Sequence, residues 1–248
     1  MFIGISCTSS NKKNLSMLHG AIVRGDSTQN KLTLVFTGDI FADGTEHIRK
    51  VLKKHEIKGA FFFTGNYYRN PDFEKSILDL IEDGHYLGAH SDRHLLYCDW
   101  ENRDSLLVSN SEFLTDLEAN YKEMRRFGIS KDQVPYYLPP YEWYNKTIAE
   151  WTSNTGLQLI NMTHGTLSHA DYTSPEMLNY RTSKEIFSNI LNFERKNTSG
   201  LNGFLLLMHI GTDPKRKDKF YYHLEDLILE LKSRKYKITG IHELLASG

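Results

Sequence analysis

The chain has 248 residues, 40% of them hydrophobic, which is long enough to bury a sizeable core as one domain. A formal net charge of −1 and a pI near 6.8 give no strong electric field, so nucleic acid is not an expected partner. No apolar run reaches the roughly 20 residues that a transmembrane helix needs. These properties favour a globular domain without a spanning segment.

Residues 1–30 form a polar N-terminal tail in this interpretation. Ser6 precedes Cys7 and a polar stretch follows, which resembles the end of a bacterial lipoprotein signal and predicts a lipid anchor at Cys7. The charged region of a complete signal is missing and its apolar region is too short, so an ordinary disordered terminus is the alternative. A lipid anchor or secretion would place the protein in the cell envelope or outside the cell. The cytoplasm is the alternative location. Residues 21–25 could add a short strand or hairpin.

Residues 31–248 alternate between short apolar runs and amphipathic segments, a pattern typical of parallel α/β folds. Strands are expected at 32–36, 59–64, 86–89, 136–138, 157–161, 203–208 and 236–239. Helices are expected at 46–55, 72–83, 111–127, 144–154, 184–196 and 221–231. About seven βα units result, and no internal repeat is visible, so we predict one barrel rather than tandem domains.

Polar residues follow several of these strands, at the ends where barrel enzymes build their sites. They include Asp39, the pair His90 and His94, His164 and His209. Asp39, His90 and His94 make a two-histidine, one-carboxylate set, which suits Zn²⁺ or Fe²⁺ and leaves positions open for water and substrate. We therefore expect one divalent ion, with zinc favoured. For the two histidines alone, a turn cap and a solvated surface residue are the alternative roles.

Several segments together resemble the NodB-type polysaccharide deacetylases, carbohydrate esterase family 4. His90-Ser-Asp-Arg-His94 is similar to the family's H-S/T-x-x-H metal motif, and Leu207-Met-His209 to its fifth motif. Gly59 to Gly65 resembles the strand after the first motif, and Pro139-Pro-Tyr141 the third. The resemblance covers most of residues 31–248. It implies a distorted (β/α)7 barrel and metal-dependent removal of N- or O-linked acetyl groups from a polysaccharide or oligosaccharide.

Two departures from the family pattern concern the general base. The first motif has consecutive aspartates after a phenylalanine, a base and a metal ligand, whereas Phe36-Thr-Gly-Asp39 supplies one carboxylate. The arginine that pairs with that base is replaced by Leu138. Losing both members of a charge pair is physically coherent, because a lone buried charge is costly. Either another residue serves as the general base, with Asp43 and Glu142 as candidates, or the protein has lost activity. An N-cap of the following helix is the alternative role for Asp43.

The resemblance also implies the remaining roles. His209 would protonate the leaving group, with Asp171 orienting it and His164 as a competitor for that task, and the Tyr141 N–H would share the oxyanion. If His209 is not catalytic, it is a strand-end residue bonded to a carbonyl. The expected substrate-binding surface comprises Leu138, Pro140, Tyr141 and Trp143. A carbohydrate-binding or metal-binding pseudoenzyme and a hydrolase of a small amide remain alternatives to the deacetylase.

Overall fold

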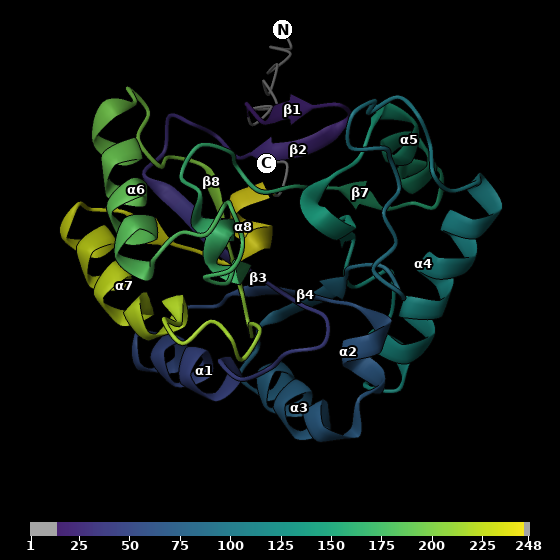
Figure 1. Ribbon diagram of the computed structural model, residues 1–248, viewed down its shortest axis with the longest axis horizontal. Helices are drawn as coiled ribbons and strands as arrows, with labels where there is room; N and C mark the ends of the chain where they lie inside the picture. The colour runs from purple at the N-terminus through teal and green to yellow at the C-terminus, as the bar shows by residue number, and fades with distance from the viewer. Residues whose placement is uncertain (1–13, 246–248) are drawn as a thin grey trace, which may run out of the picture.

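A curled sheet of parallel strands forms the centre of the molecule in a computed structural model that describes residues 14–245. Its strands are β3 (Lys31–Gly38), β4 (Ala60–Phe63), β5 (Tyr86–Ala89), β6 (Tyr136–Tyr137), β7 (Gln158–Leu159), β8 (Phe204–His209) and β9 (Lys237–Ile238). The order is β7-β6-β5-β4-β3-β8, and β9 pairs with the start of β3. The predicted (β/α)7 barrel class is confirmed, with the sheet curling through the middle of Figure 1.

Helices surround the sheet on its outer side (Figure 1). They are α1 (Thr45–Lys54), α2 (Gly65–Arg69), α3 (Glu74–Glu82), α4 (Asn110–Arg125), α5 (Lys146–Asn154), α6 (Ser183–Lys196), α7 (Leu224–Ser233) and α8 (Ile241–Leu245). Their apolar residues recur at helical spacing: on α1, Ile48, Val51 and Leu52 are buried. None of the helices in the described part of the chain has both the length and the apolar character to cross a membrane.

The strands read as continuous apolar runs because both of their faces are covered. Phe61, Phe62 and Phe63 of β4 are all fully buried, although successive side chains of a strand point to opposite sides. One side packs inside the barrel and the other side lies under the helices. This packing explains why the sequence shows no alternation of apolar and polar residues in this strand.

A hairpin of β1 (Ser16–Leu18) and β2 (Ala21–Arg24) lies across the two ends of the curled sheet. Ile22 forms a parallel bridge with Ile160 beside β7, and the Gly25 N–H donates to the carbonyl of Gly203 before β8, at 2.7 Å. Ala21 and Ile22 are buried. Part of the segment interpreted as a tail therefore closes the barrel. The boundary at residue 31 stays a prediction, and Cys7 lies outside the described residues.

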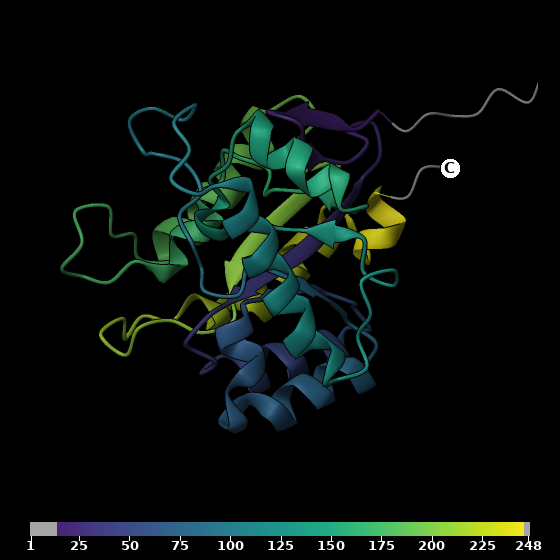
Figure 2. The ribbon, with the colours of Figure 1, turned by 90° about the vertical axis from the view of Figure 1, so that its right-hand side faces the viewer.

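Long loops extend from the face at which the strands end. Figure 2 shows three of them projecting on the left: residues 95–109 after β5, residues 173–182 after the 3₁₀ segment Ser168–Tyr172, and residues 210–219 after β8. An ion pair of 2.6 Å between Lys215 and Glu176 connects the second and third loops. The candidate site lies on this face.

Candidate active site

His90 follows β5 and is buried and oriented by three hydrogen bonds. Its N–H is shared between the carbonyl of Phe63 and the side-chain oxygen of Asn120, and its Nδ1 lies 2.8 Å from the carbonyl of Leu138. A carbonyl can only accept, so Nδ1 carries the proton and Nε2 keeps its lone pair. Burial lowers the pKa of His90, and the neighbouring His94 lowers it further, which favours the neutral ring that metals bind.

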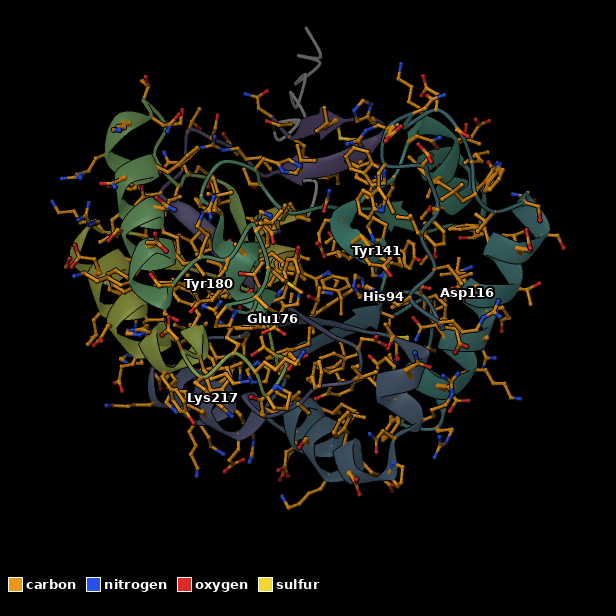
Figure 3. The ribbon with its side chains drawn as sticks, in the orientation of Figure 1. His94, Asp116, Tyr141, Glu176, Tyr180 and Lys217 are labelled. Carbon is orange, nitrogen blue, oxygen red and sulfur yellow. The ribbon has the colours of Figure 1, made fainter. Side chains whose placement is uncertain are left out.

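The loop from Ser91 to His94 is held by Asp116 of α4. The Asp116 carboxylate accepts from the Ser91 hydroxyl at 2.6 Å and from the N–H groups of Asp92 and Arg93 at 2.9 and 3.1 Å. Ser91 and His94 both have positive φ, which these bonds stabilise. Figure 3 shows Asp116 on α4 beside the loop that carries His94. Asp116 and Asn120 were not predicted from the sequence, although two polar residues four apart on one buried helix face could have indicated them.

Asp39 follows β3 and faces the same region. Its Oδ1 accepts from the Thr64 hydroxyl at 2.8 Å and from the Asn66 amide at 3.1 Å. Burial lowers the pKa of His94, and the negative charge of Asp39 partly offsets that effect, so the two side chains are electrostatic neighbours. The donor set therefore has the chemistry that zinc prefers. Within residues 14–245, however, no three His, Cys, Asp or Glu side chains are arranged as a complete metal cluster.

His209 ends β8 and is bound twice by Asp171. The Asp171 carboxylate accepts from the His209 N–H at 2.8 Å and from its Nδ1 at 2.7 Å. Burial alone would lower the pKa of His209, but the ion pair and hydrogen bond with Asp171 outweigh it and raise the pKa. The competing residue, His164, makes no hydrogen bond to His209 among those of the described residues, so Asp171 is the group that orients the ring.

Glu142 lies beside this pair, at the end of the segment that follows β6. Burial raises the pKa of Glu142 to about 7, while His209 lowers it and Asp171 raises it. Tyr141 and Glu142 both have left-handed backbone angles, with φ of 58° and 52°. Such angles cost about 1–3 kcal/mol for residues other than glycine and tend to occur at functional sites. The Asn161 amide donates to the Glu142 carbonyl at 2.8 Å and supports this turn.

Asp43 is engaged in a separate network. Its carboxylate accepts from the Thr212 N–H at 2.8 Å and from the Tyr221 hydroxyl at 2.9 Å, and it pairs with Lys219 at 2.8 Å. Burial opposes ionisation, yet these contacts lower the pKa of Asp43. The alternative role as N-cap is wrong, because Gly44 occupies that position of α1 and no side chain caps it. Asp43 joins the loop after β3 to the loop after β8.

The expected substrate-binding surface is only partly exposed. The Tyr141 ring is exposed and lies 4.3 Å from the His94 ring, and Trp143 is half-buried. The side chains of Leu138 and Pro140 are buried, so their assignment to this surface is corrected. Apolar side chains at the base of a strand end pack inward, and Leu138 contributes its carbonyl to His90 instead.

The positions at which the family motif has its charge pair are both neutral and buried. Thr37 stands first after Phe36, and its hydroxyl has no hydrogen-bond partner in the described structure. Leu138 takes the place of the arginine and is fully buried. A carboxylate could not be kept at one position without its cation at the other, because an unpaired charge would be buried.

The comparisons with known proteins agree with this geometry. The family model described as polysaccharide deacetylase matches residues 25–160, more than half of the chain. The chain therefore belongs to the polysaccharide deacetylase family, as the resemblance predicted.

Relatives with similar sequences are about a fifth to a quarter identical to this chain over the aligned residues. The peptidoglycan-N-acetylmuramic acid deacetylase PdaA of Bacillus subtilis is 21% identical over 92% of this chain and 75% of its own. The peptidoglycan-N-acetylglucosamine deacetylase PgdA of Listeria monocytogenes is 25% identical over 88% of this chain, which spans 39% of PgdA. An uncharacterised 30.6 kDa protein of Geobacillus stearothermophilus is 23% identical over 92% of this chain and 75% of its own.

Solved structures share the fold at low identity. BA3943 of Bacillus anthracis, described as a CE4 family pseudoenzyme, superposes with a TM-score of 0.71 at 18% identity, covering 93% of this chain and 70% of its own. PdaA of Bacillus subtilis superposes with a TM-score of 0.69 at 21% identity, covering 92% and 85%.

Proposed function

We propose that this protein is a metal-dependent deacetylase that removes N-linked acetyl groups from a glycan of the bacterial cell envelope, with His209 and Glu142 transferring protons and Asp171 orienting His209. The observation that carries the proposal is the doubly bonded Asp171–His209 pair beside Glu142. A binding module has no need for an oriented histidine of this kind. The names of relatives that act on peptidoglycan support the proposed envelope location, and a lipid anchor at Cys7 belongs to the same proposal.

Asp39, His90 and His94 would hold one divalent ion, and zinc suits two imidazoles and a carboxylate. His90 supports this assignment because its Nδ1 bond to Leu138 leaves Nε2 as the ligand atom. When bound, such an ion acts as a Lewis acid that polarises the acetyl carbonyl and makes a nearby water more acidic.

His209 would act as the general acid. The Nδ1 proton is committed to Asp171, so the Nε2 proton is the one that can reach the leaving nitrogen. The raised pKa of His209 keeps the ring protonated over a wider range of pH. Transfer of its proton to the leaving nitrogen allows a neutral amine to depart instead of an unstable amide anion.

Glu142 would act as the general base, in place of the carboxylate missing at Thr37. It lies in the electrostatic reach of His209, and a pKa of about 7 matches a group that takes a proton from the attacking water and later releases it. Asp43 is the weaker candidate because Lys219 and Tyr221 already occupy its oxygens. The Tyr141 N–H, in the turn set by Pro139 and Pro140, would donate to the oxyanion.

The proposal is tested by measuring acetate release from N-acetylglucosamine oligosaccharides and from peptidoglycan, with zinc added at equimolar concentration. We expect turnover by the unmodified protein and none by His209→Ala, while both bind the same amount of zinc by mass spectrometry. Turnover that survives in His209→Ala would exclude the acid role. A zinc-loaded protein that releases no acetate from any of these substrates would overturn the enzyme proposal.

A second candidate function is a glycan-binding pseudoenzyme. The buried Thr37 favours it, because the family base is absent there, and the fold relative BA3943 is described as a pseudoenzyme. Glycan binding without acetate release would support this candidate.

A further inference from the structure

Two exposed aromatic rings stand at the edge of the site and have no role in the chemistry above. Trp100, in the loop after β5, is 54% exposed, and Tyr141 is 45% exposed. Their rings meet edge to face with centroids 5.6 Å apart, and the centroids of the Trp100 and Trp143 rings lie 5.4 Å apart in a tilted arrangement. Tyr141 in turn contacts His94 at 4.3 Å (Figure 3). The exposed rings therefore form a surface that continues directly from the histidine pair.

The loop that carries Trp100 is fixed to the body of the protein. The Trp143 Nε1–H donates to the Asp99 carbonyl at 3.1 Å, and Arg103 donates to the Tyr144 carbonyl at 2.6 Å. The Asn145 amide donates back to the Arg103 carbonyl at 3.0 Å, and the Arg103 guanidinium stacks 3.4 Å over the Trp143 ring. These contacts involve the residues on either side of Trp100. They hold the indole of Trp100 in place while leaving more than half of it in water.

We propose that Trp100 extends the exposed ring of Tyr141 into an aromatic wall, and that this wall stacks on a sugar ring next to the one being deacetylated. This inference rests on the proposed function for the position of the reacting sugar near His94. It adds the neighbouring subsite and the residue that defines it.

The chemistry of sugars explains why these rings suit a glycan. A pyranose presents a face of C–H groups, which packs on an aromatic face, while its hydroxyl groups stay in water. Binding covers apolar ring surface that is otherwise exposed, and fixed rings lose little conformational freedom when the ligand binds. An apolar protein partner could also cover exposed aromatic rings, and the test below distinguishes it from a glycan.

The test compares Trp100→Ala with a matched control in the same loop. Leu107 is 51% exposed and is held through its backbone N–H to Tyr97, so Leu107→Ala removes an exposed apolar side chain away from the wall. For the N-acetylglucosamine tetramer, Trp100→Ala is expected to raise KM roughly tenfold with little change in kcat, as loss of one ring contact predicts. The effect should shrink to about twofold or less for the monomer. Trp100→Phe should restore most of the lost affinity, and Leu107→Ala should match the unmodified protein.

A binding measurement separates this inference from the proposed function. The dissociation constant for the tetramer is measured by calorimetry for the unmodified protein, Trp100→Ala and Leu107→Ala, independent of turnover. Binding that depends on Trp100 without acetate release would support the aromatic wall and contradict the proposed deacetylase activity. If Trp100→Ala releases acetate with the same KM and the same dissociation constant as the unmodified protein, the aromatic wall is contradicted. Loss of a dimer in Trp100→Ala, seen by light scattering, with unchanged glycan binding would assign the rings to a protein contact and also overturn the proposal.

Discussion

Glu142 is subject to opposing influences: burial and Asp171 disfavour its charge, and His209 favours it. Desolvation is the largest of these effects, and the resulting pKa of about 7 is the property that a base working near neutral pH needs. Asp43 shows the reverse balance, since Lys219 and Tyr221 stabilise its ionised form. Two carboxylates that looked equivalent in the sequence therefore have different chemistry.

Glu142→Gln should lower kcat roughly 10²- to 10⁴-fold, the usual contribution of a general base, with the metal retained. Asp43→Asn should change kcat by less than about tenfold, because it removes a loop contact and no proton acceptor. Acetate release and zinc content are measured for both variants. Full activity in Glu142→Gln would exclude it as the base.

The pH dependence of activity should be bell-shaped. The acid limb rises through the Glu142 pKa of about 7, as the base loses its proton. The alkaline limb falls through the His209 pKa, which Asp171 raises above its ordinary value, as the acid loses its proton. Asp171→Asn removes that stabilising charge, so the alkaline limb should move to lower pH and the maximum rate should fall.

The control for this profile is Asp226→Asn, an exposed carboxylate on α7, which should leave both limbs in place. An alkaline limb that stays at the same pH in Asp171→Asn would mean that another group sets it.

Metal binding is tested by His94→Ala, which removes one proposed ligand. Zinc bound after gel filtration should fall from about one equivalent to near zero, because two remaining protein ligands hold zinc weakly. His164→Ala is the control and should retain the metal, since no described contact joins His164 to His90 or Asp39. Unchanged zinc in His94→Ala would show that the ion lies elsewhere.

Among the elements, α4 has the largest role in shaping the site. Asn120 bonds the N–H of His90 and the carbonyl of Phe63, and Asp116 bonds the loop from Ser91 to Arg93. A capping box between Ser109 and Glu112 fixes the start of this helix. The helix thus serves as a rigid support that places two histidines at one strand end.

Asp116→Ala should lower the free energy of unfolding by about 2–4 kcal/mol, because two N–H groups and a hydroxyl lose a charged acceptor. Zinc affinity should fall roughly 10- to 100-fold, as for other residues that orient metal ligands. Urea unfolding and competition with a chelator measure the two effects. Glu118→Ala, on the exposed side of the same helix, should change neither. An unaltered zinc affinity in Asp116→Ala would contradict the supporting role of α4.

At the scale of the whole molecule, the barrel is completed by a segment from outside its βα repeats. The parallel pairs from β7 through β8 leave the sheet open between its two edges, and β2 lies in that gap through Ile160 and Gly203. Covering the two edges satisfies their backbone groups and protects the core from water.

Ile22→Ala should therefore lower the free energy of unfolding by about 2–5 kcal/mol, the usual cost of such a cavity in a core. Met17→Ala, in the same hairpin but exposed, should have no measurable effect. Hydrogen exchange would show faster exchange at Asn161 and Gly25 in the first variant. Equal stability of the two variants would contradict a closing role for the hairpin.

The class of fold and the order of the site segments could be predicted from local patterns in the amino-acid sequence. Short apolar runs such as Tyr86 to Ala89 predicted buried strands with accurate bounds, because length and composition encode them locally. The five-residue helices α2 and α8 were missed, since such a short span contains too little of a helical period. The position of His90, His94 and His209 at strand ends also followed from local pattern.

The contacts of each polar group could not be predicted in this way, because they depend on how distant segments pack together. Asp171 rather than His164 bonds His209 across 38 positions of sequence, and Asp43 meets Tyr221 across 178. Burial raises the pKa of Glu142 through contacts that no local spacing describes. The physical reason is that periodicity reports the contacts within one element, whereas hydrogen-bond partners, charge neighbours and solvent exposure arise where distant segments meet.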